Sequence, residues 1–224
     1  MTVLTTGQEV VCGFASVILD VDSTLCGIEG IDWLAERRGA EISSRVVELT
    51  AQAMRGAIAL DAVYGERLAM VAPSRDDISA LANAYIASLA PGVTAALARL
   101  RAEGRRVVLV SGGMREAIVP MARALGFDEH DVHAVSVHHD AGGCYVGFDA
   151  TSPLATAHGK HDVARRLELP RRTIAVGDGA TDLAMRPAVD AFAAFVGFAR
   201  RDAVVAGADL VVESFDQLVE LVLA

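Results

Sequence analysis

The chain has 224 residues, a formal net charge of −9 and 53% hydrophobic residues. This length fits one large domain, or one domain that carries a smaller insertion, and the apolar fraction excludes an intrinsically disordered chain. The acidic balance argues against nucleic acid or an anionic membrane surface as a partner. No apolar run approaches the roughly 18 residues of a membrane span, and residues 1–13 lack the basic and long apolar regions of a signal peptide.

Three short apolar runs predict the strands of a buried parallel sheet, because they are rich in β-branched residues and end abruptly at polar or glycine residues. The runs cover residues 17–19, 107–110 and 174–176, and residues 191–196 and 209–212 can extend the sheet. Helical patterns at 115–125 and 162–167 lie between the second and third runs, which indicates crossover helices and an α/β fold. Residues 215–223 predict a closing amphipathic helix with Ser214 as its N-cap.

Residues 30–90 carry a different pattern, in which strand-like runs are absent and apolar residues recur at helical spacing. Pro73-Ser74 marks a turn with a helix beginning at Ser74 or Asp76. We therefore expect an all-helical insertion over 30–90, hinged at 27–30 and at Pro91-Gly92. Residues 1–29 and 91–224 would then form the α/β core domain.

The cysteines and histidines predict neither a disulfide framework nor a structural metal site. Cys12, Cys26 and Cys144 are odd in number and far apart, which favours a reducing, cytoplasmic setting. Six histidines lie between positions 130 and 161 but match no metal-binding motif, so we interpret them as solvated loop and hairpin residues. The hairpin itself is predicted from residues 132–137 and 144–148, which flank a glycine-containing turn.

Pairs of carboxylates follow two of the predicted strands. Asp20 and Asp22 come directly after the first, and Asp178 and Asp182 follow the third in a glycine-containing loop. The carboxyl ends of parallel strands meet at one sheet edge, where open α/β folds bind ligands. Clustered carboxylates repel one another unless a cation or a proton relieves them, and Mg²⁺ takes oxygen ligands of this kind. Each pair alone also fits an acidic or glycine-rich surface turn.

Ser111 and Lys160 suggest binding of an anion. Ser111-Gly112-Gly113 follows the second strand, where a hydroxyl and unobstructed backbone amides opening a helix would form an anion cradle. A tight strand-to-helix turn has the same composition. Lys160 is the only lysine among 20 basic residues, and its compact ammonium suits a phosphate and crowded carboxylates better than an arginine fork does. Chance retention of a single lysine is the alternative.

The ordered set resembles the haloacid dehalogenase (HAD) superfamily of phosphatases, whose pattern is DxDxT, then Ser or Thr, then Lys, then GDxxxD. These elements stand here as Asp20, Asp22 and Thr24; Ser111; Lys160; and Asp178 with Asp182. From Val17 to the C-terminus the chain is also similar to the L-phosphoserine phosphatase family. The segments that carry this similarity are residues 29–32, 53–56, 66–69, 109–113, 147–149 and 177–182.

The resemblance implies a Rossmann-like parallel sheet with the helical insertion as a cap domain. It also implies Mg²⁺-dependent hydrolysis of phosphoserine through an aspartyl phosphate. The implied roles are Asp20 as nucleophile and Asp22 as general acid and base; Ser111, Gly112, Gly113, Lys160 and Thr181 as phosphate-binding residues; Asp20, Asp178 and the carbonyl of Asp22 as metal ligands; Asp182 as a supporting residue; and Glu29 and Arg67 as partners of the substrate ammonium and carboxylate. Without the resemblance, Glu29 and Arg67 would be interpreted as exposed helix charges.

Five residues depart from the family's usual pattern without touching the four motifs: Ile28, Leu60, Met114, Val135 and Ser136. They leave open a phosphatase of the same superfamily for another small phosphomonoester. A signalling domain that stores a phospho-aspartate is a third possibility, which the helical insertion and the second acid beside the nucleophile disfavour. The expected partner is a small phosphorylated metabolite, and the expected state is a monomer or a homodimer.

Overall fold

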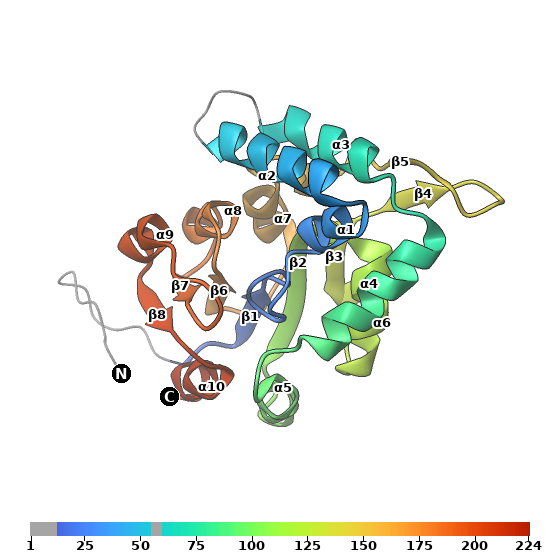
Figure 1. The fold of residues 1–224 in the computed structure, drawn as a ribbon. Helices are drawn as coiled ribbons and strands as arrows, with labels where there is room; N and C mark the ends of the chain where they lie inside the picture. The colour runs from blue at the N-terminus through green and yellow to red at the C-terminus, as the bar shows by residue number, and fades with distance from the viewer. Residues whose placement is uncertain (1–12, 55–59) are drawn as a thin grey trace.

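The structure, a computed structural model, describes residues 13–54 and 60–224, and its main element is a six-stranded parallel sheet in the order β3-β2-β1-β6-β7-β8 (Figure 1). These strands are β1 (Ser16–Leu19), β2 (Arg106–Met114), β3 (Val132–Val135), β6 (Thr173–Gly177), β7 (Ala191–Phe195) and β8 (Leu210–Val212). The α/β prediction is confirmed, and the runs at 191–196 and 209–212 do extend the sheet as β7 and β8.

Helices cover both faces of this sheet because successive strand residues point to opposite faces and both sets are apolar. Val17 and Leu19 face a cluster that includes residues of α5 (Val93–Ala102), α6 (Arg115–Ala124) and α10 (Phe215–Leu223). Ile18 faces a second cluster with residues of α7 (Gly159–Arg166) and α9 (Asp202–Gly207). The closing helix has the predicted cap, since the Ser214 hydroxyl accepts a hydrogen bond from the Gln217 amide.

The strand order reverses at β1. The chain adds β2 and β3 on one side of β1 and β6, β7 and β8 on the other. Leu19 is in register with Leu109 of β2 and with Val176 of β6. The residues that follow β1 and β6 are therefore brought together at the carboxyl edge of the sheet, where such folds bind ligands.

Between β1 and β2 the described residues form helices joined by loops and turns, with isolated bridges near the ends and no strand. Its helices are α1 (Gly30–Arg37), α2 (Ala40–Met54), α3 (Leu60–Val71) and α4 (Arg75–Ala87), followed by α5 of the core. Ser74, one of the two helix starts that the sequence allows, is the N-cap of α4, and it forms a capping box with Asp77. In Figure 1, α2 and α3 lie above the sheet edge, while α4 runs beside α6 of the core.

The helical segment does not enclose a core of its own. Buried residues of α1, α3 and α4, such as Leu34, Leu68 and Leu81, belong to the same apolar cluster as one face of the sheet. The two connections to the core are hydrogen-bonded to each other, because the Gly27 amide donates to the Ser88 carbonyl over 2.9 Å. A separate cap domain bounded at residues 30 and 90 stays a prediction.

The predicted hairpin is partly wrong. Residues 132–135 form β3 and pair in parallel with β2, whereas the hairpin consists of β4 (Val137–His139) and β5 (Tyr145–Phe148). The sequence conceals this division because residues 132–138 are a mixture of apolar and polar residues with no Gly or Pro at the change of partner. The backbone groups at the edge of β2 need hydrogen-bond partners, and β3 supplies them.

Some sequence inferences fall on residues with uncertain placement. Cys12 and residues 55–56 of one family-like segment lie outside the described residues. Cys26 is a buried free thiol and Cys144 an exposed one. Among the described helices, none combines the length and the apolar composition of a membrane span.

Candidate active site

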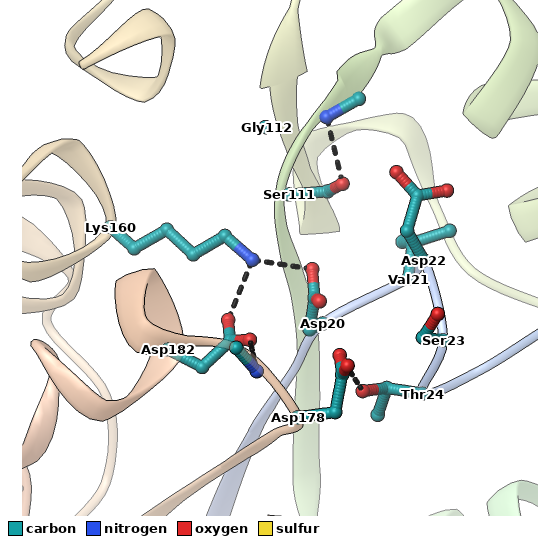
Figure 2. Close-up of polar contacts among 12 residues, drawn as sticks. Asp20, Val21, Asp22, Ser23, Thr24, Ser111, Gly112, Lys160, Asp178 and Asp182 are labelled. Atoms are coloured by element: carbon teal, nitrogen blue, oxygen red, sulfur yellow. Dashed lines mark hydrogen bonds and ion pairs between the residues drawn. The ribbon is translucent and has the colours of Figure 1, made fainter. Parts of the chain in front are cut away.

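Three buried carboxylates meet at the carboxyl edge of the sheet (Figure 2). Asp20 follows β1, Asp178 follows β6, and Asp182 lies in the short helix α8 (Ala180–Leu183). Each side chain places an oxygen within 4.8 Å of the other two, and all three residues are buried. Gly177 permits this approach, because a Cβ atom there would lie 2.3 Å from Cγ of Asp182. The sequence prediction that these acids converge is confirmed.

Lys160 joins two of these acids. It lies in the first turn of α7, and its Nζ donates to Oδ1 of Asp20 over 2.5 Å and to Oδ1 of Asp182 over 2.6 Å. The other oxygen of Asp182 accepts the Gly179 amide over 2.9 Å. Asp182 is therefore held from both sides and fixes the ammonium of Lys160 beside Asp20.

The protonation equilibria of this cluster reflect burial and crowded charge. Burial raises the pKa of Asp20 well above its usual range and Asp182 raises it further, while Lys160 opposes the shift. Burial alone would lower the pKa of Lys160, but the carboxylates of Asp182 and Asp20 raise it above its ordinary value. Lys160 thus keeps its positive charge, and crowding among the acids disfavours ionisation of Asp20.

Arg201 is a site residue that the sequence reasoning missed. Its guanidinium forms an ion pair with Asp178 and approaches Glu29, with 3.5 Å between Nη2 and Oε1. Thr24 contacts the other oxygen of Asp178 over 3.4 Å. Arg201 lies in the loop after β7. The acids were identified by inspecting the residues beyond the carboxyl ends of strands, and the same inspection after β7 includes Arg201.

The Ser111-Gly112-Gly113 segment lies on the neighbouring strand. The sequence places it after the strand, but β2 continues to Met114 with an irregular register beyond Val110, and α6 begins only at Arg115. The Ser111 hydroxyl accepts the Gly113 amide over 3.0 Å, and the Gly112 carbonyl accepts the hydroxyl of Tyr64 over 2.8 Å. These groups therefore belong to the irregular end of β2 and precede the helix, which begins two residues after Gly113.

Asp22 points away from the carboxylates of Asp20 and Asp178 (Figure 2). Its Oδ1 accepts the hydroxyl of Tyr85 over 2.7 Å and the amide of Gly30 over 3.2 Å. Burial and the negative charge of Glu29 raise the pKa of Asp22 to about 7, against the lowering effect of these hydrogen bonds and of Lys160. A carboxyl group that titrates near neutral pH can both donate and accept a proton.

The two residues implied in substrate recognition lie on the helical side of the site. Glu29 directly precedes α1 and accepts the Ser23 hydroxyl over 2.7 Å. Arg67 projects from α3, donates to the Thr50 hydroxyl over 3.1 Å, and keeps its Nε buried with no hydrogen-bond partner among the described residues. Burial lowers the pKa of Arg67, partly offset by nearby acids.

Thr181 lies half-buried in the first turn of α8, next to Asp182. Nothing in its surroundings assigns it to phosphate binding, which stays a prediction.

The site fits a hard divalent cation. Asp20, Asp178 and Asp182 offer carboxylate oxygens alone, at a spacing that could hold a metal ion. The side chain of Asp22 is not in this group, so a ligand role for Asp22 rests on its backbone carbonyl.

Comparisons with known proteins agree with this geometry. The family model described as haloacid dehalogenase-like hydrolase matches residues 17–187. A phosphoserine phosphatase of Bos taurus is 36% identical over 214 residues, covering 94% of each chain. The chloroplastic phosphoserine phosphatase of Arabidopsis thaliana is 35% identical over 91% of this chain and 70% of that protein. A phosphoserine phosphohydrolase-like protein from Francisella tularensis superposes with a TM-score of 0.81 at 25% identity, covering 93% of this chain and 99% of that one. This chain therefore belongs to the haloacid dehalogenase-like hydrolases and, within them, to the phosphoserine phosphatase family.

Proposed function

We propose that this protein hydrolyses L-phosphoserine to serine and inorganic phosphate through an aspartyl phosphate on Asp20. The observation that carries the proposal is the buried Asp20 carboxylate at the sheet edge, held by Lys160 among further acids. Relatives that align over nine-tenths of the chain are named phosphoserine phosphatases. A carboxylate nucleophile divides the difficult hydrolysis of a phosphomonoester into two easier transfers.

In the first step, a carboxylate oxygen of Asp20 forms a bond to phosphorus and the bond from phosphorus to the serine oxygen breaks. Asp22 donates a proton to that departing oxygen. In the second step, Asp22 removes a proton from the water that attacks the aspartyl phosphate, which releases phosphate and restores Asp20. The raised pKa of Asp22, about 7, suits a group that must serve first as an acid and then as a base.

The phosphoryl oxygens need positive and hydrogen-bonding groups throughout both transfers. The ammonium of Lys160, the Ser111 hydroxyl and the amides of Gly112 and Gly113 would supply them, with Thr181 beside them. Asp182 would hold Lys160 in place through the bond already present over 2.6 Å.

Mg²⁺ is the proposed cofactor, held by Asp20, Asp178 and the carbonyl of Asp22. When bound, it supplies positive charge that offsets the crowded carboxylates and the phosphoryl oxygens. Asp182, the third member of the buried carboxylate cluster, would support this arrangement.

Recognition of the serine moiety is assigned to the helical segment 30–90, which we propose acts as a cap, and to the residue just before it. Arg67 would bind the substrate carboxylate, which its buried Nε supports, since no described residue accepts a hydrogen bond from that atom. Glu29 would bind the ammonium, which its negative charge close to Asp22 supports. A second candidate is a phosphatase for another small phosphomonoester, because Leu60, Val135 and Ser136 depart from the usual family residues.

The test is phosphate release with Mg²⁺ from L-phosphoserine, phosphothreonine, phosphoethanolamine, glycerol phosphate and p-nitrophenyl phosphate. We expect a strong preference for L-phosphoserine. Arg67→Ala should then lower kcat/KM for phosphoserine by roughly 10- to 100-fold, the value of a charge-assisted contact, and barely affect p-nitrophenyl phosphate. Arg45→Ala, an exposed position on α2, is the matched control. Equal losses on both substrates would refute the carboxylate assignment, and poor turnover of phosphoserine would favour the second candidate.

A cytoplasmic location belongs to the same proposal, supported by the free thiols of Cys26 and Cys144. The oligomeric state, a monomer or a homodimer, stays a prediction that light scattering can test.

A further inference from the structure

Tyr85 is a fully buried tyrosine whose only polar group ends beside Asp22. It projects from the last turns of α4, and its hydroxyl donates to Oδ1 of Asp22 over 2.7 Å. A buried tyrosine hydroxyl requires a hydrogen-bond partner, and here that partner is a carboxylate 63 positions earlier in the chain. The contact joins the end of the helical segment to the loop that follows β1.

Gly30 shows how closely this contact is packed. Its amide donates to the same oxygen of Asp22 over 3.2 Å, and a Cβ atom at Gly30 would lie 2.2 Å from the Tyr85 hydroxyl. The first residue of α1 therefore leaves room for the hydroxyl and shares its acceptor. Two donors from different helices fix one oxygen of Asp22.

The other oxygen of Asp22 faces the predicted phosphate site. A Cβ atom at Gly113 would lie 3.3 Å from Oδ2 of Asp22 and 3.2 Å from the Ser111 hydroxyl. The two oxygens of the Asp22 carboxylate therefore have different surroundings. Oδ1 accepts hydrogen bonds from Tyr85 and Gly30, whereas Oδ2 lies beside the segment that would hold the phosphoryl group. Such an arrangement restricts the side-chain rotation that would otherwise turn Oδ2 away.

We propose that Tyr85 is a positioning residue for proton transfer, whose hydroxyl anchors Oδ1 of Asp22 so that Oδ2 is directed at the leaving-group oxygen of the substrate. The inference rests on the proposed function, in which Asp22 protonates the serine oxygen. Tyr85 itself touches neither substrate nor the reacting atoms.

The dependence of the rate on the leaving group tests this role. Serine leaves as a strongly basic alkoxide unless it receives a proton, whereas p-nitrophenolate is a stable anion that leaves without one. We expect Tyr85→Phe, which keeps the ring and removes the hydroxyl, to lower kcat/KM for phosphoserine about tenfold, part of the usual contribution of a general acid. For p-nitrophenyl phosphate, kcat/KM should stay within about twofold, because kcat/KM reports formation of the aspartyl phosphate and not its hydrolysis.

Three further variants make the result interpretable. Gly30→Ala should give the same selective loss as Tyr85→Phe, because the new methyl group displaces the hydroxyl. Tyr145→Phe, on β5, is the matched control, since the Tyr145 hydroxyl forms no hydrogen bond within the described part of the chain, and it should change neither rate. Asp22→Asn should show a larger selective loss on phosphoserine than either helix variant.

The outcomes separate this inference from the proposed function. Equal losses on both substrates in Tyr85→Phe, or no loss on either, would overturn the role of Tyr85. The proposed function would still stand if Asp22→Asn lowered kcat/KM for phosphoserine selectively. If the wild-type protein did not hydrolyse phosphoserine, or if Asp22→Asn lowered kcat/KM equally for both substrates, the proposed acid role of Asp22 and this inference would be overturned together. Thermal unfolding of each variant shows whether a loss of activity reflects a loss of fold.

Discussion

Asp22 should destabilise the metal-free protein at neutral pH, and replacing it with asparagine should remove the penalty. The pKa of Asp22 is raised from 3.8 to about 7, chiefly by burial and by Glu29. Asparagine keeps an oxygen that can accept the hydrogen bonds of Tyr85 and Gly30 but carries no charge. The difference between the two proteins therefore reports mainly the cost of ionising this half-buried carboxyl group.

The sign and size of the effect follow from proton linkage. The pKa of Asp22 is higher in the folded than in the unfolded protein. The resulting contribution to stability is therefore fully present when the pH is below the pKa of the unfolded state, and it is lost as the pH rises through about 7. Each pH unit between the two values costs about 1.4 kcal/mol. Between about pH 5.5 and pH 8 the gain from Asp22→Asn should therefore increase by about 2 kcal/mol, an upper value because the residue is partly exposed.

The assay is urea denaturation of both proteins in EDTA at the two pH values. Titrating groups that do not interact with Asp22 are shared and cancel in the difference between the variants, whereas Asp20, whose pKa Asp22 raises, adds to the pH-dependent gain. Asp76→Asn, at an exposed position on α4, is the matched control and should show no pH-dependent gain. If the gain from Asp22→Asn is the same at both pH values, burial does not penalise this charge and the reasoning fails.

Three further predictions concern the carboxylate cluster. Lys160→Met leaves Asp20 and Asp182 buried without their shared cation. The free energy of unfolding should therefore fall by about 3–5 kcal/mol, and phosphate release should cease. An unchanged midpoint of urea denaturation would contradict this prediction. Gly177→Ala places a Cβ atom 2.3 Å from Cγ of Asp182, and we expect about 1–3 kcal/mol of destabilisation with a lower kcat, whereas wild-type values would show that Asp182 tolerates displacement. Mg²⁺ should raise the thermal unfolding temperature of the wild type but not of Asp178→Asn, and equal shifts would exclude Asp178 from the metal site.

Much of the site could be predicted because its chemistry follows the strands. Asp20 and Asp178 each come just beyond a short apolar run, and the parallel register of β1 and β6 is enough to bring them together. Lys160 stood out because it is the only lysine. Tyr85 gave no comparable signal, since a tyrosine in an amphipathic helix looks like an ordinary core residue. Arg201 follows a strand as the acids do, but an arginine in a chain rich in arginine looks like an ordinary surface residue.

The sequence by itself determined the α/β class, the helical segment after the first strand, the helix cap at Ser214, and the order of the four family-like motifs. These features depend on local periodicity and on residue types that are adjacent in the chain. Only the tertiary structure decided that residues 132–135 join the sheet and not the hairpin, and that Tyr85 contacts Asp22 across 63 positions. Such choices depend on which distant backbone edges and buried polar groups need partners, and that requirement exists only once the chain has packed.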